Sequence, residues 1–443
     1  MRHTTRAVLA ALLLAATAAG AASADGAPGA LDLATARALA LAGSASVRKA
    51  ELAVESASLA YSARVYDGLP SLGASASGSA GYDYAAAGAS GPDASLRVSV
   101  AQTVLDGGKG ASQRGQAAVA LEAAEAALRA ARVEAIGEAD DAFYAALKAA
   151  ASAEAAAADL AAARLRLEIA SAKAAAGVLA RSDYLMAESE AAGYETTLIK
   201  ARKAAASASA RLASMTGLPA STTLVPVDFS AYDGLLERLS TLDDDGGLVA
   251  SLTSAAAEAN PGLAGYALSA RKAELAVAEA MAGYAPTVTL GLSQGVDWEA
   301  GGGFGVGDLS LSLSASMDLG FWATANGVAA AAVSSRSAAV DGADAARALA
   351  LDVEVAVNDL LAAAGTIASS STALEYAESS YESALERFRL SAASASDLSS
   401  AEALVSSGRT ALIGAHYDFL SCLTTLRGLV GVEDDGAILA ALP

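Results

Sequence analysis

The chain repeats one order of segments twice, and this duplication constrains its fold more than any local motif. The arm from Val47 to Pro70 matches the arm from Leu263 to Pro286 at an offset of 216 residues. Two later landmarks recur in the same order: Leu105-Asp106-Gly107-Gly108 matches Met317-Asp318-Leu319-Gly320 at an offset of 212, and Ser182-Asp183 matches Ser396-Asp397 at 214. A repeat of this size predicts two copies of one structural unit.

Residues 1–24 have the three regions of a secretory signal peptide. Arg2 and Arg6 precede an apolar run from Ala7 to Ala19, and Ala22-Ser23-Ala24 supplies small residues for cleavage. The apolar run is well short of the ~20 residues that a membrane-spanning helix needs, and no other segment qualifies as such a helix. We therefore expect an exported protein, with an uncleaved anchor as the alternative for this segment.

Charge and cysteine content exclude several classes of function. The formal net charge is -20, which argues against nucleic acid as a partner. Cys422 is the only cysteine, so the chain has neither an intramolecular disulfide nor a zinc-binding cysteine pattern. Hydrophobic residues make up 54% of the chain but aromatic residues only 5%, because alanine supplies the excess. Such a composition favours long, closely packed helices.

The helical segments are unusually long. A short arm is expected at Leu31–Tyr66, and a segment without proline from Gly110 to Ala174 is long enough for one helix of roughly 100 Å. The chain then reverses near Gly177 to Ser182 and returns as a helix. The second half repeats the pattern, with helices expected at Ala323–Leu390 and Asp397–Val430. Each half therefore carries a long helical hairpin.

Alternating residues precede each hairpin and predict strands. The alternation is clearest at Val288–Leu292 and Leu309–Met317, where apolar residues alternate with serine, threonine or glycine. Leu72–Tyr84 and Leu96–Val104 show it more weakly, with a loop expected around Gly88–Pro92. Each strand is near the 9 to 11 residues that a tilted strand needs to cross a bilayer. Aromatic residues flank the strand ends, as in membrane-interface girdles: Tyr82, Tyr84, Trp298 and Phe304 at one end, Phe321 and Trp322 at the other.

Four strands cannot stand alone in hydrocarbon, because the edge strands would leave backbone amides without partners. The sheet must therefore close by oligomerisation. Two copies would barely close a barrel, whereas three copies give 12 strands and room for a channel.

The chain resembles the TolC-like outer membrane efflux protein family over essentially its whole mature length. The marks that carry the resemblance are Pro70 and Pro286, Leu105-Asp106-Gly107-Gly108, Asn260-Pro261-Gly262-Leu263, and Gly177 followed by Ser182-Asp183-Tyr184-Leu185-Met186-Ala187. No single mark is specific, but their order, spacing and duplication together are.

The resemblance implies a mainly α protein with a membrane β-barrel portion, in which a homotrimer forms a 12-stranded barrel and a long periplasmic α-helical barrel. Such proteins are passive outer membrane conduits without catalysis or cofactors, in tripartite efflux pumps or type I secretion systems. Their partners are a periplasmic adaptor, an inner-membrane pump or ABC transporter, and outer membrane lipid. The expected domains are the signal peptide 1–24, a first repeat 25–217 (strands about 70–84 and 96–104, hairpin 108–215), a linker 218–247, a second repeat 248–431 (strands about 287–298 and 309–318, hairpin 322–430) and a tail 432–443.

The resemblance also assigns roles to the hairpin turns. In the family these turns form the periplasmic aperture, and an acidic residue after the second turn faces the pore; Asp397 matches that position and Asp183 is its repeat counterpart. Capping of the returning helix is the alternative role for Asp397. Residues at the tips for adaptor contact are Gly177, Ser182, Ser391 and Ser396. The chain departs from the best-known members at Phe388, which replaces a tyrosine, and Ala393, which replaces an arginine; Arg387 and Arg389 lie nearby.

Two other functions compete with the channel. Gly291-Leu292-Ser293-Gln294-Gly295 fits a hydrolase nucleophile pattern, but that pattern needs a strand-to-helix turn and a histidine base, and His416 is the sole mature histidine. A secreted or periplasmic coiled-coil scaffold, with the serine-rich segments as linkers, would explain the long helices. It would not explain four alternating segments at repeated positions.

Overall fold

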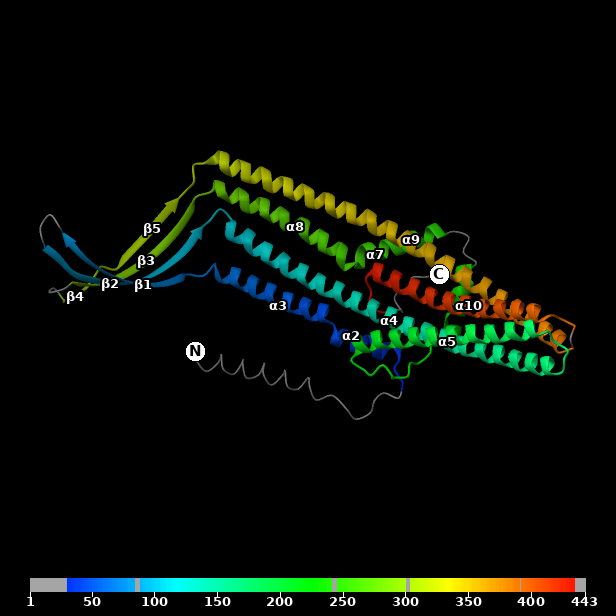
Figure 1. Ribbon diagram of the computed structural model, residues 1–443. Coiled ribbons are helices and arrows are strands. Elements are labelled where there is room, and N and C mark those ends of the chain that lie inside the picture. Colours follow the sequence, from blue (N-terminus) through cyan, green and yellow to red (C-terminus); the bar gives the residue numbers. More distant parts are fainter. Residues whose placement is uncertain (1–29, 84–87, 241–244, 300–302, 391, 435–443) are drawn as a thin grey trace. The chain divides into compact units, whose positions relative to one another are not determined.

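The computed structural model describes residues 30–83, 88–240, 245–299, 303–390 and 392–434 (Figure 1). The expected signal peptide, and residues 435–443 of the expected tail, lie outside these ranges. The chain divides into two compact units. The strand unit comprises Ser44–Glu138, Gly234–Thr366 and Asp418–Pro443, and the hairpin unit comprises Met1–Gly43, Ala139–Asp233 and Ile367–Tyr417.

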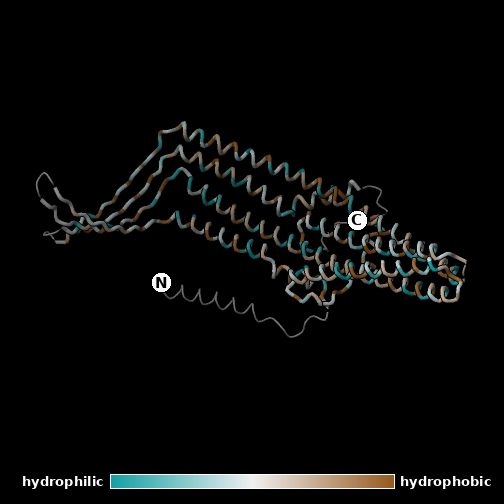
Figure 2. The backbone as a smooth tube through the Cα atoms, viewed as in Figure 1, coloured by the Kyte–Doolittle hydropathy of each residue, from teal (hydrophilic) through white to brown (hydrophobic). Residues whose placement is uncertain are grey.

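Two very long helices run through both units. Helix α4 spans Lys109–Ala175, with 67 residues, and α9 spans Phe321–Arg389, with 69 residues. Each is followed by a returning helix of 36 residues, α5 at Arg181–Thr216 and α10 at Ala395–Val430. None of the four contains proline, and alanine supplies most of the helix propensity. Apolar and polar stretches alternate along these helices (Figure 2), as expected for helices that pack in pairs.

The N-terminal arm is two helices, which corrects the single helix predicted over Leu31–Tyr66. Helix α2 spans Leu33–Gly43 and α3 spans Ala45–Tyr66. Ser44 separates them with an extended backbone (ψ 123°), and its hydroxyl accepts a hydrogen bond from the Val47 amide. Serine at this position starts a new helix, because it satisfies an amide that has no partner within the helix.

In the strand unit, α3, α8 (Pro261–Met281) and the first parts of α4 and α9 lie side by side (Figure 1). Small residues allow close approach: a Cβ added to Gly115 of α4 would meet the Leu275 side chain of α8 at 3.2 Å. Polar contacts fix the same pair, since the Gln113 and Gln116 amides each donate to the Glu279 carboxylate at 2.7 Å. The strands therefore continue into a packed helical layer.

The sheet is antiparallel, in the order β1-β2-β3, with β4 and β5 both paired to β3. The strands are β1 at Ser71–Asp83, β2 at Gly88–Leu105, β3 at Thr287–Glu299, β4 at Gly303–Val306 and β5 at Ser310–Ser316. Because β4 and β5 follow each other along one partner, they form a fourth strand with a break. At this break Gly307 donates its amide to the Gly295 carbonyl at 2.9 Å, and Gln294 donates its side-chain amide to the Gly307 carbonyl.

A predicted loop is strand in the structure. Residues 88–95 belong to β2, although a loop was expected around Gly88–Pro92. The register of β1 and β2 shifts between Ser79 and Gly81, opposite the stretch that contains Pro92. Proline lacks an amide and is tolerated where a bulge interrupts the ladder. Glycine and proline therefore mark an irregularity here and not the end of the strand.

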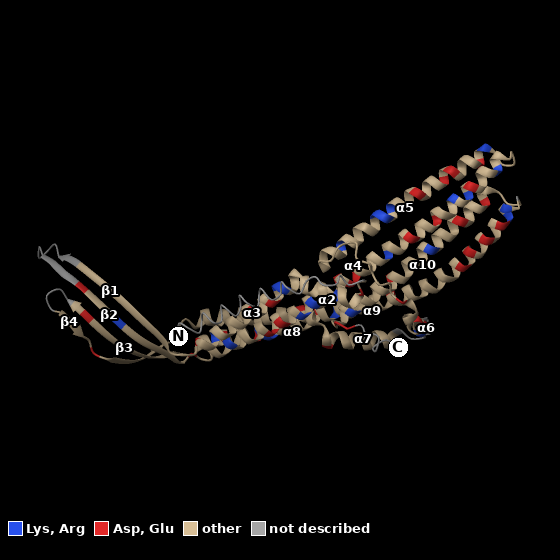
Figure 3. Cartoon of the chain, turned by 90° about the horizontal axis from the view of Figure 1, so that it is seen from below, with Lys and Arg blue, Asp and Glu red and all other residues tan. Residues whose placement is uncertain are grey.

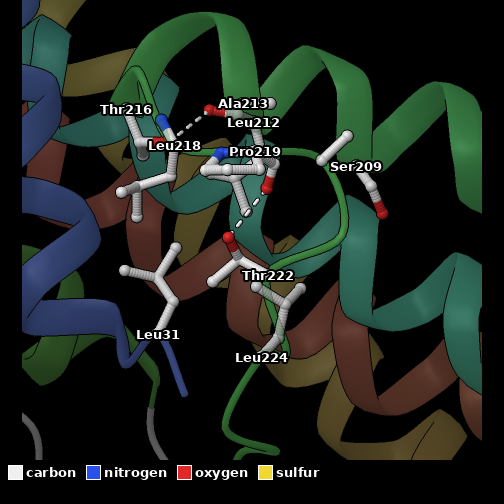
Figure 4. Close-up of a pocket in the computed structure, with 10 residues that line it drawn as sticks. Leu31, Ser209, Leu212, Ala213, Thr216, Leu218, Pro219, Thr222 and Leu224 are labelled. Atoms are coloured by element: carbon white, nitrogen blue, oxygen red, sulfur yellow. Dashed lines mark hydrogen bonds between the residues drawn. The ribbon is translucent and has the colours of Figure 1, made fainter. Parts of the chain in front are cut away.

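The linker expected at 218–247 contains η1 (Phe229–Tyr232) and α6 (Asp233–Ser240). Helix α7 (Asp245–Ala259) begins at the end of this linker and continues into the second repeat, whose arm ends with η2 (Ala282–Tyr284). In the hairpin unit the start of this linker pairs with the N-terminal arm, since Leu31 donates to the Thr223 carbonyl at 2.7 Å and Val225 donates to the Leu31 carbonyl at 2.9 Å. A small cavity lies among Leu31, Leu212 and Leu224 (Figure 4). Beside it, the Thr222 hydroxyl donates to the Pro219 carbonyl and closes the turn between these two residues. This cavity, about 10 Å³, is a packing void and too small for a ligand.

Among the described residues, no helix has both the length and the apolar character that crossing a membrane requires.

Candidate functional site

The sheet has one apolar and one polar face, and the register carries both across every strand. One row places Leu72, Val100, Leu292 and Leu311 opposite one another, and a second places Ala76, Leu96, Val296 and Val306. The intervening rows hold small polar residues, as in Ser99, Ser293 and Ser310. Hydroxyls join neighbouring strands on this face, with Ser77 to Ser95 and Ser293 to Ser310 both at 2.8 Å. Charged residues are few along the strands (Figure 3).

The apolar face is uncovered in the single chain. Leu72 is 76% exposed, Leu311 72% and Leu313 72%. Both outer strands, β1 and β5, pair on one side only in the part of the chain that the structure describes. In water, such a face and such edges would favour aggregation. The arrangement suits a sheet that meets lipid with one face and continues into neighbouring copies at its edges.

Aromatic residues stand at both ends of the sheet. Trp298 of β3 pairs in register with Phe304 of β4, which is 83% exposed. At the opposite end, Phe321 and Trp322 begin α9, and the Phe321 ring stacks on Tyr284 at a centroid distance of 6.4 Å. Tyr82 lies in β1, but its side chain is outside what the structure describes, as is Tyr84 altogether. The aromatic pairs that are described thus stand at opposite ends of the sheet, and their role at two membrane interfaces stays a prediction.

Asp397 lies in the first turn of α10 and takes part in a capping box. Its carboxylate accepts a hydrogen bond from the Ser394 amide at 3.0 Å, and its own amide donates to the Ser394 hydroxyl at 3.1 Å. The Ser394 hydroxyl and amide hold the pKa of the Asp397 carboxyl below its ordinary value, with a small contribution from Arg387. Ser394 is thus the N-cap, and Asp397 is its reciprocal partner rather than the cap itself.

The first hairpin lacks this box although Asp183 stands at the equivalent position. Ala180 is the N-cap of α5 and makes no side-chain hydrogen bond, while Ser182 donates to Asp183 at 3.3 Å. Gly177, with a φ of 74°, ends α4 in the left-handed conformation that favours glycine. Ser396 lies in the first turn of α10, and Ser391 lies outside the described residues. The two tips therefore share a path but differ in capping.

Lys173 connects the two hairpins near their tips. Its ammonium donates to the Phe388 carbonyl at 2.5 Å and lies 4.1 Å from the centre of the Phe388 ring. Phe388 is 2% exposed and packs with Ala395, Leu398 and Ala393. Arg389 pairs instead with Glu386 on its own helix at 2.7 Å. Phenylalanine and alanine at 388 and 393 thus belong to an apolar cluster that the Lys173 ammonium contacts.

A buried charge cluster lies farther from the tips. Arg166 of α4 is 3% exposed and forms ion pairs with Glu190 of α5 and, at 2.9 Å, with Glu402 of α10. Ser399 donates to Glu190 at 2.8 Å, and Ser406 donates to Asp159 at 2.5 Å. Burial raises the pKa of Glu402 to about 7; Arg166 lowers it, while Glu190 and Asp159 raise it further. The cluster joins three helices of the hairpin unit.

The hydrolase alternative has no structural support. Ser293 lies inside β3, which continues to Glu299, so the strand-to-helix turn that the motif needs is absent there. The His416 ring stacks on Phe229 at 4.3 Å, and burial lowers its pKa. Within the described ranges, no three histidine, cysteine, aspartate or glutamate residues are grouped to hold a metal ion.

Sequence reasoning missed three of the polar positions that tie elements together. Lys173 and Arg166 carry no local signal, because each acts on a helix that is distant in sequence. Ser394 did carry one, since serine followed three residues later by an acidic residue is the pattern of a capping box.

Comparisons with known proteins agree with this geometry. The family described as outer membrane efflux protein matches residues 36–218 and 252–432. No curated protein sequence matches the chain. Among solved structures, CusC has a TM-score of 0.80 at 14% identity, covering 93% of this chain and 95% of its own. VceC of Vibrio cholerae has 0.75 at 18% identity, covering 90% and 96%, and CmeC of Campylobacter jejuni has 0.77 at 14%, covering 92% and 88%.

Proposed function

Because the chain belongs to the outer membrane efflux protein family, we propose that it forms a passive channel through the outer membrane that extends into the periplasm. The observation that carries this is the two-faced sheet joined directly to helices of 67 and 69 residues. The sheet supplies a lipid-facing surface and a hydroxyl-lined surface, and the helices supply length beyond the membrane. A coiled-coil scaffold would not require an uncovered apolar sheet face.

The channel is a homotrimer in this proposal. Four strands per chain, with β4 and β5 counted as one, give 12 strands in three copies, in which β1 of one copy pairs with β5 of the next. Closure satisfies the edge amides and places the serine-rich face around the lumen. The neighbours in the structural comparison share this fold, and the CmeC structure is described as an outer membrane channel.

The two hairpin tips form the periplasmic end and meet the other components. Gly177, Ser182, Ser391 and Ser396 contribute to the surface that contacts a periplasmic adaptor, which links the channel to an inner-membrane pump or ABC transporter. Asp183 and Asp397 place carboxylates at this end. The capping box uses one carboxylate oxygen of Asp397, so the side chain can take part in the capping box with Ser394 and still present negative charge to the pore.

The first experiment is the protein mass of the full-length particle extracted in detergent from outer membranes, by light scattering corrected for bound detergent. Three chains per particle, together with discrete conductance steps in planar bilayers, support the channel. A water-soluble monomer or dimer that needs no detergent would replace it with the scaffold. Asp397→Ala tests the pore charge separately: conductance and cation preference should both fall, and unchanged values limit Asp397 to capping.

A further inference from the structure

The hairpin unit contains a pocket of about 480 Å³ whose walls come from α4, α9 and α10. Its polar lining consists of Asp159, Glu378, Tyr381, Glu382, Glu402 and Arg409. Ala162, Leu385 and Val405 supply the apolar part. The volume falls within the range of sites for small organic molecules, which combine an apolar wall with a few convergent polar groups.

The pocket carries more negative than positive charge. Four carboxylates line it, against one guanidinium. That guanidinium, Arg409, is already engaged by Glu378 at 3.2 Å and Asp159 at 3.8 Å. Arg166, which does not line the pocket, is shared between Glu402 and Glu190 of α5. The four lining carboxylates and Glu190 are thus accompanied by two guanidinium groups, Arg409 and Arg166.

Glu402, which lines the pocket, has one buried carboxylate oxygen without a hydrogen-bond partner among the described residues. Glu402 is 4% exposed, and its Oε2 faces Arg166 while its Oε1 is buried without a partner among the described residues. A buried carboxylate oxygen without a donor is costly, because the group has lost its water. A ligand with a positive charge and an N–H donor would satisfy both the oxygen and the excess charge.

We propose that this pocket binds an organic ammonium ion, with its N–H groups donating to Glu402 and its apolar part lying against Leu385, Val405 and the Tyr381 ring. A bare metal ion fits less well, because the described residues contain no cluster of three metal ligands and Ala162, Leu385 and Val405 make part of the pocket wall apolar. The aromatic ring adds a surface that attracts cations. This inference goes beyond the channel proposal, since binding requires no conduction.

The pH dependence of binding follows from the groups around Glu402. These are Asp159 and Arg166 on α4, Glu190 and Tyr194 on α5, Glu378, Tyr381 and Glu382 on α9, and Arg409 on α10. Burial raises the pKa of Glu402 to about 7, so the carboxylate is largely protonated at pH 6 and largely ionised at pH 8. A primary ammonium ion keeps its charge over this range, as lysine does. Affinity should therefore increase several-fold from pH 6 to pH 8.

The test is calorimetric titration of the full-length protein in detergent with phenethylammonium chloride, compared with phenethyl alcohol at the same ionic strength. The ammonium probe should bind saturably and the alcohol should not. Glu402→Gln should weaken binding about tenfold or more and abolish its pH dependence. Glu382→Gln, at the exposed rim, should weaken it two- to threefold and provides a test should Glu402→Gln fail to fold. Glu386→Gln, an equivalent change on α9 outside the pocket, should leave affinity unchanged.

Three results would overturn the proposal: no saturable binding, equal binding of the alcohol, or equal losses in the Glu386 and Glu402 variants. The last would mean that general surface charge attracts the probe. Conductance of the same preparations separates the two proposals, because a channel that conducts normally without binding the probe leaves the proposed function intact.

Discussion

Asn260 joins the start of α8 to the end of α10 through a hydrogen bond of 2.7 Å from its side-chain amide to the Leu429 carbonyl. The other side-chain atom, Oδ1, accepts from the Leu263 amide at 2.9 Å and caps α8, with Pro261 at the first helical position. One residue thus satisfies an unpaired donor of one helix and an unpaired acceptor of another. The Asn-Pro-Gly-Leu mark of the sequence therefore has a structural cause.

Replacement of Asn260 should loosen both helix ends. Asn260→Ala removes the cap and the link and should cost about 1–3 kcal/mol of local stability. Asn260→Ser keeps a capping oxygen but loses the donor to Leu429, so its effect should be smaller and confined to the end of α10. Amide hydrogen exchange at both helix ends measures this. Equal effects of the two variants would mean that the cap contributes nothing, whereas a serine variant that behaves like the wild type would mean that the link to Leu429 contributes nothing.

Gly431 lies at the same junction, and its surroundings there determine how a substitution should affect stability. This glycine ends α10 with a φ of 82°, and a Cβ there would lie 2.7 Å from the Pro261 ring and 2.9 Å from the Asn260 Cα. Gly431→Ala combines backbone strain with a clash against backbone and should cost more than 1 kcal/mol. Gly428→Ala, three residues earlier in the helix with open space around it, should be neutral or slightly stabilising. Thermal unfolding followed by circular dichroism compares the two.

The two hairpin tips offer a gain-of-stability test. Ala180 stands where Ser394 caps the second hairpin, so Ala180→Ser should complete a capping box with Asp183. The expected gain at the start of α5 is about 0.5–2 kcal/mol, seen as slower hydrogen exchange there. Ser394→Ala should produce the opposite change at the start of α10. If both changes leave exchange unaltered, the tips are held by contacts other than capping.

The sequence predicted the elements better than their connections. Repeated landmarks and period changes located both hairpins and the strands, because helix length and strand alternation are properties of local sequence. The spacing of apolar residues predicted one helix over Leu31–Tyr66, but Ser44 divides it into two. Pro92 lies within a strand, because a bulge accommodates it. Lys173 and Glu402 could not be assigned from sequence, since their partners Phe388 and Arg166 lie more than 200 residues away.

Lys173 should hold the two hairpins together near their tips. Lys173→Met keeps most of the apolar stem but loses the hydrogen bond and the ring contact, and should cost about 1–2 kcal/mol. Hydrogen exchange in the last turns of α4 and α9 should then accelerate about tenfold. Lys200→Met, at an exposed position on α5, is the control. Phe388→Leu should weaken the attachment of Lys173 less than Lys173→Met does, because the backbone carbonyl of residue 388 still accepts the hydrogen bond from the ammonium.

Glu402 should make the stability of the hairpin unit fall as pH rises. Its pKa is about 7 in the folded chain and 4.5 when unperturbed, so the folded state holds the proton more tightly between these values. The contribution is fully present below pH 4.5 and is lost as pH rises through 7. Glu402→Gln cannot ionise, so the unfolding temperature of the variant minus that of the wild type should increase between pH 4.5 and pH 7 and then stay constant. A difference that is flat with pH would show that Glu402 is ionised throughout.

The same substitution should have different effects at neighbouring positions on the two faces of the sheet. Val100 belongs to the apolar face and Ser99 to the polar face of β2. If the apolar face meets lipid, Val100→Arg should cost about 2–4 kcal/mol near the bilayer midplane and prevent assembly of membrane trimers. Ser99→Arg should assemble normally and reduce cation conductance, because the added charge lines the lumen. Equal tolerance of both substitutions in membrane fractions and planar bilayers would mean that the sheet does not separate lipid from water.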